Sequence, residues 1–289
     1  MTEAGGTLVD PDQADGMVWV DPRDPEGLRT ALATSPARWV QLPFAGIESF
    51  VAAGVIDPGH TWTCAKGIYG HASAEHALGL LLVAARSLHR HARARSWIRN
   101  AELSETRRLH GSIVLIVGTG GIGAALGGML EPLGPRILAV NRSGRAVGWA
   151  SRTVAMHAMT RLLPEADFVV VAAPLTPETT GLFDVEAFRL MRSDAWLINV
   201  ARGRLVDTEA LVEALREGRI AGAALDVTDP EPLPDGHALW TMENVIITSH
   251  AANTSAMAVP ELAALVARNV RRFATGEQLE GLVDVGLGY

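Results

Sequence analysis

The sequence contains very little cysteine or lysine. Cys64 is the only cysteine, so no disulfide can form within the chain and no cluster of cysteines can bind zinc. Lys66 is the only lysine, and the remaining basic side chains are arginine. We expect no metal site. The low cysteine content fits a reducing compartment, and we expect a cytoplasmic protein.

Long hydrophobic runs and an excess of positive charge are also missing. The longest apolar run, Ala77 to Ala85, is well short of the roughly 20 residues that a membrane helix needs. The first residues, MTEAGGTLVDPDQADG, are polar and acidic, whereas a signal peptide begins basic and becomes apolar. The net charge of −7 argues against binding to nucleic acid or to an anionic membrane. We therefore expect neither as a partner.

From Met17 onward, short apolar runs alternate with segments of helical periodicity. This alternation predicts an α/β fold with parallel sheets, and runs rich in Val, Ile and Ala are typical of strands covered on both faces. The expected helices are 25–33, 47–53, 73–97 and 255–275, the last ending at Gly276. The expected strands are GMVWVD, ARWVQL and TWTCAKG in a first series, and SIVLIVG, RILAVN, DFVVVAA, AWLINV, AGAALDV and NVIITSH in a second.

A glycine-rich turn opens the second series. The strand SIVLIV is followed by a GxGxxG motif and then by the helical run AALGGML, which is the context that dinucleotide binding requires. In such a turn the first glycine permits the tight bend, the second lets the backbone approach a pyrophosphate, and the third allows close packing of helix on strand. The motif consists of Gly118, Thr119, Gly120, Gly121, Ile122 and Gly123.

The end of the next strand indicates which dinucleotide is bound. Asn141 lies 18 residues beyond Gly123, near the position where NAD-binding proteins place an acid on the ribose hydroxyl. No carboxylate occurs there. Arg142, Ser143 and Arg145 follow instead, and they could pair with a 2′-phosphate or simply form a solvated loop. We expect NADP(H) as the preferred cofactor, with NAD(H) possible.

Four further motifs follow the glycine turn in a fixed order: PLTPETTGLF, LINVARGRLVD, ALDVTDPEPLP and ALWTMENVIITSHAA. With them the chain resembles the D-isomer-specific 2-hydroxyacid dehydrogenases, of the glyoxylate/hydroxypyruvate reductase kind, over about residues 17–289. The resemblance implies two Rossmann-like, doubly wound parallel-sheet domains. Residues 1–98 and 256–289 would form the substrate domain, trimmed at its N-terminal side, and 99–255 the dinucleotide-binding domain.

The resemblance also assigns roles to individual residues. Arg202 matches the catalytic arginine, Glu231 the acid and His250 the acid/base histidine. Arg204 is an alternative to Arg202, and Asp226 and Asp229 lie close to Glu231, but the register of the motifs favours the first assignment. A histidine can donate a proton to a carbonyl oxygen near neutral pH, and an arginine can hold a carboxylate.

Substrate and cofactor contacts can be carried over in the same way. The backbone N–H groups of Gly67 and Ile68 would bind the substrate carboxylate, and Lys66 would either attract the anion or be an ordinary exposed lysine. His71 and His76 are interpreted as structural. Other cofactor contacts would involve Ala173, Pro174, Val200, Ala201, Asp226 and Ala252.

Besides Asn141 and the trimmed N-terminal side, two further positions depart from the family pattern. Gly121 replaces a frequent arginine, and Ser249 replaces the common proline before the histidine. The resemblance also implies a homodimer, although the run Ala77 to Ala85 could equally be buried within a monomer.

Three functions follow from these patterns. The leading one is an NADPH-dependent reductase of a small 2-oxo acid such as glyoxylate or hydroxypyruvate. The alternatives are a dinucleotide-sensing binding protein without catalysis, and a dehydrogenase of the same fold that oxidises formate or phosphite.

Overall fold

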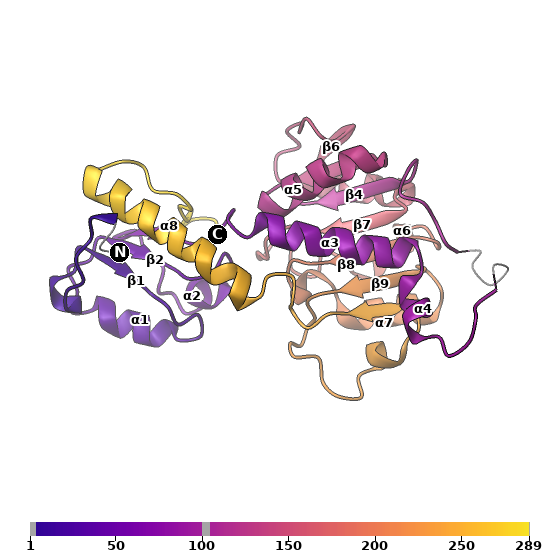
Figure 1. Cartoon of the computed structure of the whole chain (residues 1–289), viewed down its shortest axis with the longest axis horizontal. Coiled ribbons are helices and arrows are strands. Elements are labelled where there is room, and N and C mark those ends of the chain that lie inside the picture. Colours follow the sequence, from indigo (N-terminus) through magenta and orange to yellow (C-terminus); the bar gives the residue numbers. More distant parts are fainter. Residues whose placement is uncertain (1–3, 100–104, 289) are drawn as a thin grey trace. The chain divides into compact units, whose positions relative to one another are not determined.

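The computed structural model describes residues 4–99 and 105–288, and the chain divides into two compact units (Figure 1). The first unit comprises Met1–Tyr69 and Thr254–Tyr289, and the second comprises Gly70–Asn253. The family resemblance implies a first boundary after residue 98. Contacts place it at residue 69, because helix α3 (Gly70–Ala85) packs along helix α5 (Gly121–Leu130) of the second unit.

The first unit is built on a three-stranded parallel sheet. Strands β1 (Gly16–Val18), β2 (Trp39–Gln41) and β3 (Thr61–Thr63) are ordered β1-β2-β3. Its helices are α1 (Pro25–Leu32), α2 (Glu48–Ala52) and α8 (Ser255–Thr275). The core comprises Leu28, Val40, Leu42, Ile47, Phe50, Val55, Trp62 and Cys64.

A buried polar network attaches α8 and the C-terminal tail to this sheet. The amide of Asn269, fully buried on α8, donates to the Gln41 side chain at 3.0 Å and to the Glu280 carbonyl at 3.0 Å. Thr63 donates to the same Gln41 oxygen at 2.8 Å, and the Trp39 indole donates to Thr63 at 2.8 Å. Every member has a partner, so these polar groups are buried without the cost of a lost hydrogen bond.

The second unit contains a seven-stranded, wholly parallel sheet in the order β10-β9-β8-β7-β4-β5-β6. The chain first builds outward from β4 through β5 and β6, then returns to the other side of β4 with β7. This reversal is the topological switch point at which doubly wound sheets bind ligands. The strands are β4 (Ile113–Val117), β5 (Arg136–Asn141), β6 (Arg152–Ala155), β7 (Phe168–Val171), β8 (Trp196–Asn199), β9 (Gly222–Leu225) and β10 (Val245–Ile247).

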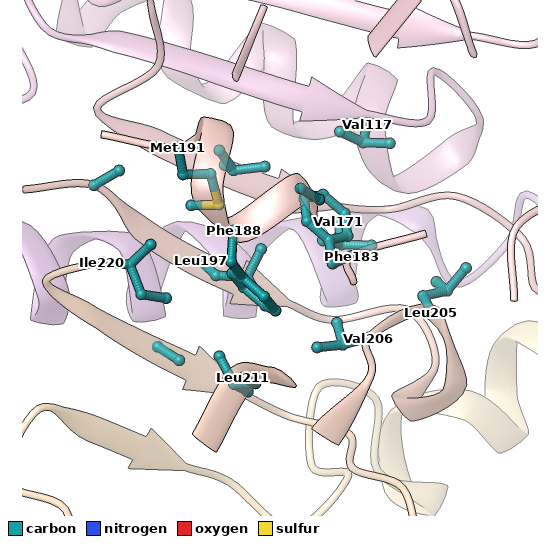
Figure 2. Packing of buried hydrophobic residues seen from close by; sticks show 14 of the residues in the cluster. Val117, Val171, Phe183, Phe188, Met191, Leu197, Leu205, Val206, Leu211 and Ile220 are labelled. Atoms are coloured by element: carbon teal, nitrogen blue, oxygen red, sulfur yellow. The ribbon is translucent and has the colours of Figure 1, made fainter. Parts of the chain in front are cut away.

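Helices cover both faces of this sheet. Successive residues of β4 point to opposite faces: Leu115 belongs to one apolar cluster, while Val114 and Ile116 belong to the other. The cluster drawn in Figure 2 includes Phe183 and Phe188, whose rings lie 6.5 Å apart. Other described helices of the second unit are α4 (Leu88–Arg93), α6 (Val185–Leu190), α7 (Thr208–Arg216) and the 3-10 helices η4 (Glu131–Leu133), η5 (Met156–Arg161), η6 (Leu163–Glu165), η7 (Gly203–Leu205) and η8 (Ala238–Thr241), whereas η2 (Pro11–Gln13) belongs to the first unit.

The expected α/β class with Rossmann-like parallel sheets is confirmed, and two elements differ from expectation. Strand β6 was not predicted, because Arg152–Ala155 is short and only partly buried and so lacks a continuous apolar run. The single helix expected over 73–97 is divided into α3 and α4 at Ser87, whose φ of 51° is left-handed. Within the described ranges, no helix is long and apolar enough to cross a membrane.

Candidate functional site

The glycine turn between β4 and α5 has the shape that a pyrophosphate requires. Gly118 has a φ of 107°, and a Cβ there would lie 2.5 Å from the Ala172 carbonyl. A Cβ on Gly123 would overlap the Gly118 carbonyl oxygen. Gly120, by contrast, has open space where a Cβ would stand and is the N-cap of α5, so a ligand can approach the first N–H groups of the helix. The residues present therefore fit a dinucleotide.

The other predicted cofactor residues follow strands of the same sheet. Because all seven strands are parallel, their carboxyl ends lie along one edge. Asn141 ends β5, and Asp226 follows β9 directly. The buried residues Ala173, Val200, Ala201 and Ala252 and the exposed Pro174 lie in loops beyond β7, β8 and β10.

Asn141 closes the loop that was predicted to recognise the ribose. Its Oδ1 accepts a hydrogen bond from the Gly144 N–H at 2.7 Å, and its Nδ2 donates to the Arg145 carbonyl at 2.8 Å. Its side chain thus shapes the turn. Arg142, Ser143 and Arg145 are exposed, and the Ser143 hydroxyl donates back to Asn141 Oδ1 at 3.5 Å.

The loop after β8 positions Arg202. Asn199, which is 1% exposed, accepts from the Ala201 N–H at 3.0 Å and donates to the Arg202 carbonyl at 2.9 Å. Arg202 is half-buried and donates to the Ala201 carbonyl at 2.7 Å, whereas Arg204 is exposed. The two arginines of this motif therefore differ in burial.

Gly203 lets the loop of Arg202 pack closely against the loop that carries Glu231, the predicted acid. A Cβ on Gly203 would overlap the Thr228 carbonyl oxygen, so only glycine allows the two backbones to approach this closely. The Thr208 hydroxyl also donates to the Asp229 carbonyl, at 2.6 Å. The segment from Thr228 to Glu231 is thereby fixed against the arginine loop.

His250 and Glu231 form a direct pair. His250 Nδ1 lies 2.6 Å from Glu231 Oε1, and the two side chains are 51% and 43% exposed. His250 has a φ of 51°, a left-handed conformation that is unusual for a residue other than glycine. A carboxylate at Nδ1 fixes the tautomer of the ring and leaves Nε2 for a reacting group.

Asp226 anchors the turn that contains His250. Its carboxylate is 1% exposed. It accepts from the Ala251 N–H at 2.8 Å, from the Ala252 N–H at 3.0 Å and from the Thr248 hydroxyl at 2.6 Å. Its backbone carbonyl also accepts from the His250 N–H at 2.8 Å. Asp226 was predicted as a cofactor contact, and the structure shows both of its carboxylate oxygens bonded to the protein.

The residues predicted to bind substrate belong to the first unit. Lys66 and Gly67 are exposed, Ile68 is half-buried, and Gly67 has a φ of 90°. Hydrogen bonds anchor the chain on both sides of them. The Cys64 N–H donates to the Gly281 carbonyl at 2.8 Å, and the Tyr69 hydroxyl donates to the Pro43 carbonyl at 3.1 Å. A loop held in this way can present backbone N–H groups without reorganising.

Two residues that the sequence analysis did not assign also belong to the site. Asn199 stands at the end of a buried strand immediately before ARGR, and a polar residue there signals a loop-shaping role. Thr248, two residues before His250, bonds to the carboxylate of Asp226. Among residues 4–99 and 105–288, no group of three or more His, Cys, Asp or Glu side chains is placed to hold a metal ion.

Comparisons with known proteins agree on one family. The family model described as D-isomer specific 2-hydroxyacid dehydrogenase, NAD binding domain, matches residues 78–252. An uncharacterized protein in the proB 3′ region of Corynebacterium melassecola is 43% identical over 87% of this chain and 84% of its own length. Glyoxylate reductase from Pyrococcus furiosus is 36% identical over 74% of this chain and 66% of its own length.

Solved structures extend the similarity to nearly the whole chain. The D-isomer specific 2-hydroxyacid dehydrogenase from Xanthobacter autotrophicus, in complex with NADPH and MES, has a TM-score of 0.84 and 30% identity, covering 100% of this chain and 90% of that one. An NADPH-dependent glyoxylate/hydroxypyruvate reductase from Sinorhizobium meliloti, in complex with NADP and sulfate, has a TM-score of 0.82 and 26% identity, covering 95% of this chain and 86% of that one. The chain belongs to the D-isomer specific 2-hydroxyacid dehydrogenases, a family of NAD(P)-dependent oxidoreductases.

Proposed function

We propose that the protein reduces a small 2-oxo acid, such as glyoxylate or hydroxypyruvate, to the D-2-hydroxy acid with NADP(H) in preference to NAD(H). The observation that carries this proposal is the His250–Glu231 pair, with 2.6 Å between Nδ1 and Oε1. A dinucleotide-sensing protein would need the glycine turn but would not need a histidine held by a carboxylate.

The proposed reaction assigns one task to each group. When bound, the nicotinamide cofactor would be the source of the hydride that reduces the carbonyl carbon. His250 donates a proton from Nε2 to the carbonyl oxygen, so that one hydride and one proton complete the alcohol, and the reverse reaction returns both. Glu231 accepts the hydrogen bond from Nδ1 and holds the ring. Arg202 bridges the substrate carboxylate and carbonyl oxygen and stabilises the negative charge that develops there.

We further propose that the second unit binds the dinucleotide and the first unit the substrate. The carboxylate would accept hydrogen bonds from the N–H groups of Gly67 and Ile68. Lys66 would add electrostatic attraction to an otherwise acidic protein, whose net charge is −7.

The preference for NADP(H) is supported by the turn that Asn141 closes. In NAD-binding proteins an acid at this position binds the ribose and would repel a 2′-phosphate. Here the turn carries two guanidinium groups and a hydroxyl instead. Replacing Arg142 and Arg145 with glutamine should weaken NADPH binding by about tenfold or more and leave NADH binding within about twofold, because only NADPH carries that phosphate. Equal losses for both nucleotides would contradict the preference.

Asn141 itself offers a sharper test. An aspartate there would introduce the acid typical of NAD-binding proteins, but it would lose the Nδ2 donor to the Arg145 carbonyl. We expect Asn141→Asp to weaken NADPH binding without improving NADH binding, because the turn opens. Tight NADH binding by this variant would show that the turn closes without the amide.

The test of the activity is the absorbance of the reduced nucleotide at 340 nm. Glyoxylate, hydroxypyruvate, pyruvate and phenylpyruvate would each be mixed with NADPH and, separately, with NADH. We expect at least one of these acids to oxidise NADPH faster than NADH. Binding of NADPH without turnover of any acid would favour the sensing protein or a formate or phosphite dehydrogenase.

The family resemblance further supports a cytoplasmic homodimer. Light scattering should then give about twice the mass of the 30.7 kDa chain. A mass near that of one chain would contradict the dimer.

A further inference from the structure

We propose that His76 is a positioning residue for the proposed reductase, and that it acts on His250 through Thr248 and Asp226. This inference rests on the proposed function. It assigns to His76 a role other than the purely structural one expected from the sequence, because its hydrogen bonds lead to the turn that carries the proton donor.

The contacts form a continuous chain across three elements of the second unit. His76 is on α3, Asp226 follows β9, and Thr248 follows β10. His76 Nε2 lies 2.9 Å from the Thr248 hydroxyl and 3.2 Å from Asp226 Oδ1. The Thr248 hydroxyl donates to the same Asp226 oxygen at 2.6 Å. The hydroxyl proton is therefore already used, and His76 must be the donor to the threonine oxygen.

The burial of these groups determines what the chain of bonds achieves. The Asp226 carboxylate is 1% exposed, and the His76 side chain is 24% exposed. A buried carboxylate needs donors on both oxygens, and here they come from His76, Thr248 and the N–H groups of Ala251 and Ala252. The same carboxylate that His76 contacts therefore holds the backbone on the C-terminal side of His250.

The backbone at His250 explains why this support matters for the reaction. The residue has a φ of 51°, a conformation that costs free energy unless the surrounding bonds maintain it. The residue before His250 is Ser249, which does not restrict the backbone as a proline would. The hydrogen bonds to Asp226 restrict the turn instead. Without His76, the carboxylate keeps its bonds to Thr248, Ala251 and Ala252 but loses one donor, so the turn that directs His250 is held less firmly.

The test breaks the same chain of hydrogen bonds at two different residues, His76 and Thr248. His76→Phe keeps an aromatic ring but removes the donor, and Thr248→Val keeps the shape of threonine but removes the hydroxyl. His76→Gln restores a donor at a similar reach. His71→Phe is the matched control, because His71 is exposed on the same helix.

We expect His76→Phe and Thr248→Val each to lower kcat by about tenfold, with the KM for NADPH changed less than twofold, as for the loss of one buried hydrogen bond to a charged group. His76→Gln should recover most of the rate, and His71→Phe should keep all of it. The double variant should lose little more than either single variant, because both substitutions break the same chain of bonds. Wild-type kcat in both single variants would overturn the proposal.

Hydrogen exchange gives a readout that does not depend on the activity. We expect the amides of Ala251 and Ala252 to exchange at least about tenfold faster in His76→Phe and Thr248→Val, with the amides of β4 unchanged. Unchanged exchange at Ala251 and Ala252, or equally faster exchange throughout the second unit, would show that His76 contributes only to packing. If the wild-type protein turns over no 2-oxo acid, the proposed function fails and this exchange still decides the role of His76.

Discussion

Replacing Glu231 with glutamine is the most informative single change at the proposed proton-transfer site. The Glu231 carboxylate lies 2.6 Å from His250 Nδ1, close enough for a charge-assisted hydrogen bond. Such a bond contributes about 1.5–3 kcal/mol when protected from water. Because the two side chains are 51% and 43% exposed, solvent screening reduces this to about 1–1.5 kcal/mol. We therefore expect Glu231→Gln to lower kcat by roughly five- to tenfold.

The size of the loss should depend on the substitution. Glutamine keeps an oxygen that can accept from Nδ1, so the ring direction is retained and only the charge is lost. Alanine removes both, and Glu231→Ala should lower kcat by about 10²-fold, within the range for general acid–base catalysis. NADPH binding should be unchanged in both variants. Asp229→Asn, which removes a charge two residues earlier in the same exposed loop, is the matched control.

Steady-state turnover of NADPH with the best 2-oxo acid measures this effect, and fluorescence titration with NADPH measures binding separately. A Glu231→Gln variant with wild-type kcat would refute the assignment of Glu231. A loss of the same size in Asp229→Asn would show that the charge of the loop matters, and not the contact with His250.

Three further predictions concern the substrate, the cofactor turn and the stability of the second unit. Arg202→Lys should lower kcat/KM by about 10²-fold while NADPH affinity stays within twofold. Lysine lacks the planar guanidinium with which arginine can bridge two oxygens of the substrate. Unchanged kinetics would remove Arg202 from the mechanism. Gly123→Ala should lower the free energy of unfolding by about 1–3 kcal/mol and weaken NADPH binding, because its Cβ would overlap the Gly118 carbonyl oxygen; a wild-type Tm would contradict this. The hydrogen bond from Arg192 lowers the pKa of Asp194 from 3.8 to about 2. Its contribution to the free energy of unfolding is therefore present above pH 3.8 and is lost as the pH falls toward 2. In urea unfolding, Asp194→Asn should show a smaller decrease of this free energy over that pH range than the wild-type protein, and an identical decrease would contradict the prediction.

The sequence alone was sufficient to predict six of the seven strands of the second unit and the glycine turn. The strands of the second unit are nearly continuous apolar runs, and a pattern of that kind is determined by burial on both faces. Helix α8 was predicted at its observed limits because Gly276, with a φ of 71°, ends it. Strand β6 was not predicted, because a partly buried strand at the edge of a sheet carries no such pattern.

The contacts of the site could be predicted only in part. The family resemblance was enough to propose Glu231 and His250 as catalytic residues, and the structure shows that their side chains are in contact. The role of His76 could not be predicted, because it depends on Thr248, which is 172 residues away along the chain. Long-range hydrogen bonds of this kind leave no local periodicity, so only the folded structure reveals them.

The central claim is that His250 transfers a proton during reduction of a 2-oxo acid by NADPH. The direct measurement is the single-turnover rate of NADPH oxidation with glyoxylate or hydroxypyruvate, in the wild-type protein and in His250→Gln, at saturating nucleotide. We predict rapid oxidation by the wild-type protein and a rate lower by about 10²–10⁴-fold in the variant, with NADPH affinity unchanged. Equal rates in the two proteins would contradict the account.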